Sequence, residues 1–185
     1  MNAVPPSIRP QSGTIQVQHH YLYAFLLSHC PNIFSSIHTC VILMPDVWSK
    51  KSSRIVEHWV PHLLSMIGPS VQELDLDFWY DAPKISSASR TRLQPFSLRK
   101  AISLRRLCLR FRSWTTSEIL FTNELLSSLP KQSAIEYIDI CITDGATVSK
   151  RDEPACVAGC NQTDTILNTP TFRSLQGQHR LPILR

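Results

Sequence analysis

A four-fold repeat of apolar positions constrains the fold of this chain more than any other feature of its sequence. Four segments fit the pattern Φ-x-x-Φ-x-Φ-x-Φ, where Φ is apolar: IHTCVILM from Ile37, VQELDLDF from Val71, LRRLCLRF from Leu104 and IEYIDICI from Ile135. Their starts are 34, 33 and 31 residues apart. The last five positions of each copy have a two-residue period, which is typical of a strand with one buried face. We therefore expect strands near residues 37–44, 71–78, 104–111 and 135–142.

The segments between these strands change to a helical period. Residues 54–67 and 116–129 carry apolar side chains at helical spacing, and residues 21–27 form a shorter version of the same pattern. Thr116 or Ser117 is the expected N-cap of the helix over 116–129. Pro61 predicts a kink, or two short segments, in the helix over 54–67.

One helix and one strand in about 30 residues is the unit of a leucine-rich-repeat solenoid, in which units stack because none buries its apolar face alone. We therefore expect an α/β fold: an irregular leucine-rich-repeat solenoid with parallel strands on the concave face and helices behind. A doubly wound α/β sheet is the alternative, and it uses a ligand-binding loop after a strand. The chain has five glycines and no G-x-G-x-x-G motif, so the solenoid is favoured.

The repeats divide the chain into four parts. We expect a disordered N-terminal segment over residues 1–18, repeats over 19–143, a polar loop over 144–160, and a degenerate or truncated last repeat over 161–185. In this last part Ile166 and Leu167 are expected to end a short helix. Phe172 and Leu175 are expected to begin a fifth strand.

Composition limits the classes of protein to consider. The 185 residues suffice for one domain, and 43% hydrophobic with 18% charged residues is typical of a globular protein. The sequence has no apolar signal segment and no apolar run of the roughly 20 residues that span a bilayer. We therefore expect an intracellular protein, cytoplasmic or nuclear, without membrane contact. Six cysteines include no CxxC pair, so free thiols are expected, with neither a metal nor a cofactor.

Motifs of catalysis are absent from the sequence. It contains no G-x-S-x-G, P-loop or HExxH motif. His58 and His62 are four residues apart with Glu57 beside the first, but the order is EHWVPH and Pro61 interrupts the helix. Solvent-facing helix positions explain these histidines better than a metal site does. We therefore predict a protein that is not an enzyme.

The repeat units resemble the leucine-rich-repeat region of F-box-like proteins common in mushroom-forming fungi. The resemblance rests on the apolar pattern and order of five segments and covers about residues 20–176. The segments are AFLLSHCPNIFSSIHTCVIL, WVPHLLSMIGPSVQELDLDF, SLRKAISLRRLCLRF, LLSSLPKQSAIEYIDICI and TDTILNTPTFRSL. The resemblance implies a protein-interaction module like the substrate-recognition part of such ubiquitin-ligase proteins.

Proteins of this family carry an F-box, a small helical module that docks onto a Skp-type adaptor. This sequence departs from that pattern. No LPxE-type helix start precedes Tyr21, and the roughly twenty residues before it are too few and too polar for three packed helices. The resemblance therefore implies a partner polypeptide held by the repeats, and docking onto the Skp-type adaptor is not carried over.

The x positions of the expected strands form the candidate partner-binding surface on the concave face. Its residues are Asp75, Asp77, Trp79, Arg106, Arg110, Arg112, Asp139 and Thr143. Alignment of the repeats places Glu73 beside Arg106 and Asp77 beside Arg110, so the arginines can be neutralised by acids of neighbouring strands. We favour that interpretation over a binding role for the strand arginines.

Nucleic-acid binding is the alternative function. Residues 84–112 contain nine Lys or Arg and no Asp or Glu: Lys84, Arg90, Arg92, Arg99, Lys100, Arg105, Arg106, Arg110 and Arg112. Such a segment can attract phosphate groups. No nucleic-acid-binding module accompanies it, so a protein partner is the preferred prediction.

Overall fold

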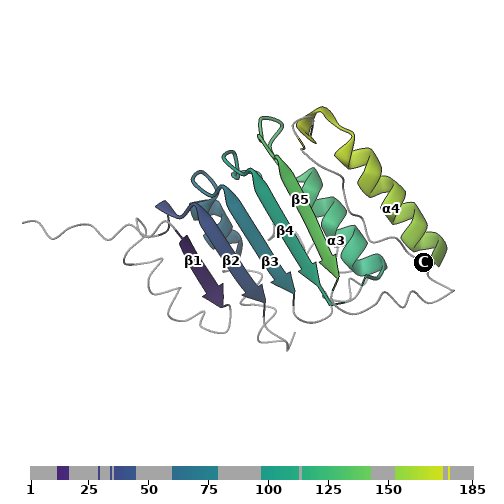
Figure 1. Cartoon of the computed structure of the whole chain (residues 1–185), viewed down its shortest axis with the longest axis horizontal. Coiled ribbons are helices and arrows are strands. Elements are labelled where there is room, and N and C mark those ends of the chain that lie inside the picture. The colour runs from purple at the N-terminus through teal and green to yellow at the C-terminus, as the bar shows by residue number, and fades with distance from the viewer. Residues whose placement is uncertain are drawn as a thin grey trace, which may run out of the picture.

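Five parallel strands form one sheet in the order in which they occur along the chain (Figure 1). The strands are β1 (Ser12–Gln16), β2 (Thr39–Met44), β3 (Glu73–Phe78), β4 (Arg106–Phe111) and β5 (Tyr137–Ile142). The structure is a computed structural model that describes residues 12–16, 29, 34, 36–44, 60–78, 97–112, 114–142, 153–172 and 175. The predicted α/β class with a parallel sheet is confirmed.

The strands pair in the register that the sequence repeat indicates. Residues at the same repeat position face each other from strand to strand, as Leu74 of β3 faces Leu107 of β4. One backbone hydrogen bond recurs between successive units. Gln72 N donates to His38 O at 2.7 Å, Arg105 N to Gln72 O at 2.8 Å, and Glu136 N to Arg105 O at 2.8 Å. Strands β2 to β5 are therefore joined by the same backbone hydrogen bond just before each strand begins.

The apolar Φ side chains explain why this register forms. On β3 and β4 all of those within the strands are buried: Leu74, Leu76, Phe78, Leu107, Leu109 and Phe111. Burial of such a side chain stabilises the fold by about 1.5–3 kcal/mol. The phenyl rings of Phe78 and Phe111 stack at 5.1 Å, and Phe121 packs edge-on against Phe78 at 5.0 Å. The core therefore lies between the sheet and the helices.

The helices between the strands lie on one side of the sheet (Figure 1). Residues 60–67 are helical between β2 and β3, and α3 (Thr116–Ser127) lies between β4 and β5. The cap of α3 is Thr115, not Thr116 or Ser117. Its hydroxyl accepts from Ser117 N, while the Glu118 carboxylate accepts from Thr115 N, which completes a capping box. The T-x-x-E spacing in the sequence already indicates this cap.

The helix α4 (Glu153–Leu167) replaces much of the loop predicted over residues 144–160. Its buried residues recur at helical spacing, but most of them are small or polar: Cys156, Gly159, Thr163 and Leu167. A search for large apolar residues therefore misses the buried face. Asn123 of α3 holds α4 through two hydrogen bonds. The Asn123 side-chain amide donates to Gly159 O at 3.1 Å, and its side-chain carbonyl accepts from Thr163 Oγ1 at 2.7 Å.

The N-terminal segment predicted as disordered over residues 1–18 contains β1. This strand pairs in parallel with β2, and Ser12 faces Thr39. Its sequence SGTIQ has a single large apolar residue, so the pattern gives no strand signal. Pairing with the edge of β2 satisfies its backbone groups instead. The prediction of disorder is therefore wrong for residues 12–16.

After α4 the repeat pattern continues, but its first apolar position is Leu175 and not Phe172. Ile166 and Leu167 end that helix as predicted. Phe172 lies in the 3-10 turn η5 (Pro170–Phe172), and Leu175 N donates to Phe172 O at 3.1 Å. Ile37 N donates to Phe34 O in the same way at 3.2 Å before β2. Phe172 thus precedes the repeat's first apolar position, and the strand predicted beyond it lies outside the described residues.

Candidate binding face

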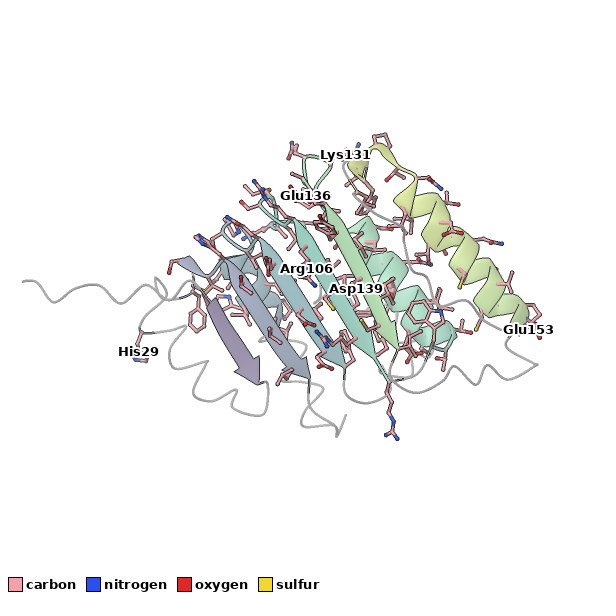
Figure 2. All side chains as sticks on the ribbon, viewed as in Figure 1. His29, Arg106, Lys131, Glu136, Asp139 and Glu153 are labelled. Carbon is pink, nitrogen blue, oxygen red and sulfur yellow. The ribbon has the colours of Figure 1, made fainter. Side chains whose placement is uncertain are left out.

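One face of the sheet carries no helix in the described part of the chain (Figure 1). This surface, here called the open face, is formed by the x positions of four strands. They are Thr39, Val41 and Leu43 of β2, Glu73, Asp75 and Asp77 of β3, Arg106, Cys108 and Arg110 of β4, and Tyr137, Asp139 and Cys141 of β5. Figure 2 shows Arg106 and Asp139 on neighbouring strands of this face.

Most of the predicted surface residues meet on the open face. Asp75, Asp77, Arg106, Arg110 and Asp139 all belong to it, on strands β3 to β5. Arg112 directly follows β4 and is exposed. Of the remaining predicted residues, Trp79 and Thr143 lie outside the described residues.

The Arg110 guanidinium is held by Asp75. Its Nε donates to the two carboxylate oxygens at 3.2 and 3.1 Å, and its Nη2 donates to Oδ2 at 2.9 Å. The strand register pairs Arg110 with Asp77, as predicted, yet the fork forms diagonally because the long arginine side chain reaches two residues back along β3. The hydrogen bonds and negative charge of Asp75 raise the pKa of Arg110 further above its ordinary value.

Arg106 is the arginine of this face that the neighbouring strands do not neutralise. It faces Glu73 on β3 and Tyr137 on β5. Within the described part of the chain, its side chain makes neither an ion pair nor a hydrogen bond. The predicted sideways pair with Glu73 is therefore not formed. Arg106 is exposed, as is Tyr137 with 48% of its surface accessible.

A hollow lies at the N-terminal ends of β3, β4 and β5, beside Arg106. Its volume is about 630 Å³, and it is lined by Gln72, Glu73, Arg105, Arg106, Glu136, Tyr137, Ile138 and Asp139. Arg105 pairs with Glu136 across its rim at 3.4 Å. A second hollow of about 210 Å³ lies between β2, β3 and β4, and Arg106 and Glu73 line both. The unpaired cation therefore lines both hollows of the open face.

Two thiols and a carboxylate meet between β4 and β5. The Sγ atoms of Cys108 and Cys141 and a carboxylate oxygen of Asp139 all lie within 4.8 Å of one another. Burial raises the pKa of Cys108 to about 12, with the negative charge of Asp75 as a further cause. Burial and the nearby Asp139 also raise the pKa of Cys141. Spacing rules miss this cluster because its members come from two strands, although the repeat alignment places Cys108 beside Asp139.

The basic segment over 84–112 does not form one basic patch in its described part. Arg105 pairs with Glu136, Arg110 with Asp75, and Lys100 Nζ donates to Ser65 Oγ at 2.6 Å. Three of its predicted cations, Lys84, Arg90 and Arg92, lie outside the described residues. Arg99 is exposed on the turn before β4.

Of Glu57, His58 and His62, which we predicted to be solvent-facing and not metal ligands, the structure describes His62 alone. It is exposed on the helix over 60–67, as predicted. Glu57 and His58 lie outside the described residues.

In the described part of the chain, no helix combines the length and the apolar character that crossing a bilayer requires.

Comparison with known proteins gives no relative: no protein-family model, no curated protein and no solved structure matches this chain. The geometry of the open face is therefore the basis for a functional interpretation.

Proposed function

We propose that the chain is a non-catalytic protein-interaction module of the leucine-rich-repeat type, similar to the substrate-recognition region of F-box-like proteins. Its open face binds a polypeptide partner. Consecutive parallel strands in one register and the recurring backbone hydrogen bond between units support the solenoid. In the part of the chain that the structure describes, helices lie on one side of the sheet only, which leaves the other side for a partner, whereas most parallel sheets are covered on both faces.

The mixed charge around Arg106 carries this proposal. Glu73 and Asp139 line the same hollow as Arg106, and Asp75 and Asp77 lie on the same face. A polyanion such as a nucleic acid would be repelled by these carboxylates along its whole length. A polypeptide can place one acidic side chain against Arg106 and basic or neutral ones beside Glu73 and Asp139. Tyr137 adds an exposed aromatic ring, a residue type that is enriched in protein interfaces.

The partner chemistry follows from these groups. We infer an extended segment with a carboxylate side chain that reaches Arg106 and an apolar side chain that packs on Tyr137. Arginine binds carboxylates through two parallel hydrogen bonds, and such charge-assisted bonds are stronger than neutral ones. Loss of a charge that is desolvated in an interface costs about 2–5 kcal/mol of binding free energy, which is roughly 30-fold or more in the dissociation constant.

Affinity capture from native extract at moderate salt, with and without nuclease, tests the proposal. We expect the wild-type chain to retain a specific polypeptide after nuclease treatment and R106E to lose it. R99E is the matched control: it makes the same charge change on an exposed arginine of the turn before β4, outside the open face. Equal capture by R106E and wild type would contradict the assigned surface. Retention that depends on nucleic acid and fades steeply with salt would favour the alternative function.

A further inference from the structure

The thiol pair on the open face has a geometry that the docking role does not require. Cys108 lies on β4, directly opposite Asp139 of β5 in the strand ladder. Cys141 follows two residues after Asp139, so that its side chain lies on the same face of the sheet. The three potential ligand atoms lie within 4.8 Å of one another. We propose that Cys108, Asp139 and Cys141 form a binding site for a thiophilic divalent cation, with Zn²⁺ as the metal that best fits the donor set.

The donor set favours zinc over hard cations. Thiolates are soft ligands that select zinc or copper, whereas Mg²⁺ and Ca²⁺ prefer sites made only of oxygen ligands. Cysteine sulfur and aspartate oxygen are both established ligands of Zn²⁺. Three protein ligands leave the fourth tetrahedral position free. A water molecule or a side chain of a bound partner can occupy that position.

The present spacing requires only a small adjustment to bind the metal. With Zn–S bonds of about 2.3 Å, two sulfurs of a tetrahedral site are about 3.8 Å apart. The three atoms all lie within 4.8 Å of one another, so two of them would approach each other by about 1 Å at most to reach that separation. The ligands stand on two strands joined by a continuous ladder, and strands hold a site more precisely than loops do.

Neighbouring charges also suit a bound cation. Two thiolates and one carboxylate around Zn²⁺ leave one net negative charge. The Arg110 guanidinium lies opposite Cys141 in the ladder, but its charge is already neutralised by Asp75, so the net negative charge at the site favours a cation. Its fork to Asp75 at 2.9 Å orients it without using Asp139 as an acceptor. The carboxylate of Asp139 therefore stays available as a ligand.

Cobalt absorption tests the site on the full chain, purified under reductant and freed of metal. Co²⁺ replaces Zn²⁺ in tetrahedral thiolate sites and gives a thiolate-to-metal charge-transfer band. We expect one Co²⁺ per chain and displacement of the band by added Zn²⁺. C141S should abolish the band. D139N should weaken Zn²⁺ affinity by at least the roughly 10- to 100-fold that loss of an outer-shell partner costs.

The control variant is C160S, which removes a half-buried thiol from the Cys156–Cys160 pair of α4. We expect it to keep the band, and circular dichroism of each metal-free variant reports its folding. No band in the wild-type chain, an unchanged band in folded C141S, or a band lost in folded C160S would each overturn the proposal. This result is independent of the capture assay, because R106E leaves all three ligands in place.

Discussion

The contact between α3 and α4 predicts that a change which normally stabilises a helix will destabilise this protein. Gly159 lies inside α4, where alanine is favoured over glycine by about 1 kcal/mol. A Cβ atom at this position would lie 2.5 Å from Ile119 Cγ2, and Ile119 is fully buried on α3. Overpacking of a core costs about 1–3 kcal/mol. The two effects leave G159A about 1 kcal/mol less stable than the wild type.

The residue at 119 decides the sign of this effect. I119A removes Cγ2, so adding G159A to it should stabilise the protein by about 1 kcal/mol, the helix-propensity term alone. I119V keeps both γ-carbons and should retain the destabilisation. Urea unfolding of the single and double variants, followed by tryptophan fluorescence, measures the coupling between positions 119 and 159. A stabilising G159A in the wild-type background would show that α4 does not pack on α3 at this point.

Two further predictions concern buried polar groups. Among the described residues, the Thr122 hydroxyl is buried without a hydrogen-bond partner. The T122V variant should therefore have a free energy of unfolding about 1 kcal/mol higher than the wild type. A lower stability of T122V would show that the hydroxyl is hydrogen-bonded. Burial raises the pKa of Cys40 from 9.0 to about 12, so the stability that its neutral thiol contributes is complete below pH 9.0 and is lost as the pH rises toward about 12. In urea unfolding C40A should therefore lose less stability than the wild type across this interval, and equal losses would refute the assignment.

The repeat pattern predicts the sheet well because one physical requirement determines it. The apolar positions of each strand have to be buried between the sheet and the helices, and the recurrence of that pattern at Leu74, Leu107 and Ile138 predicts the observed parallel register. The predicted neighbours of Arg106 and Arg110 follow directly from that register. Local pattern and tertiary packing agree in this part of the chain, and that agreement is what makes a fold predictable from sequence.

The helix α4 and the strand β1 are less predictable because their partners supply what their own sequences lack. α4 buries Gly159 and Thr163, which carry no hydrophobic signal, and its position depends on hydrogen bonds to Asn123. β1 depends on the edge of β2. A search of one sequence for apolar periodicity detects neither, since the information lies in the surface that the segment meets.

For the open face, the sequence predicts which residues lie opposite each other on neighbouring strands, but not which side chains bind each other. The repeat correctly places Glu73 beside Arg106 and Asp77 beside Arg110. It does not reveal that Arg110 binds Asp75 instead, because the choice between a direct and a diagonal acid depends on the reach of the arginine.

The diagonal choice has a consequence for Arg106. Asp75 lies on β3 between the residues that face Arg106 and Arg110, and it is already bound to Arg110. Glu73 faces Arg106 in register but makes no ion pair with it in the described part of the chain. The open face therefore keeps an unneutralised cation at its hollow and a self-neutralised one beside the thiols. We propose that a carboxylate of the partner binds at the first position, and that a divalent cation binds to the thiols and Asp139 beside the second, where Arg110 and Asp75 already neutralise each other.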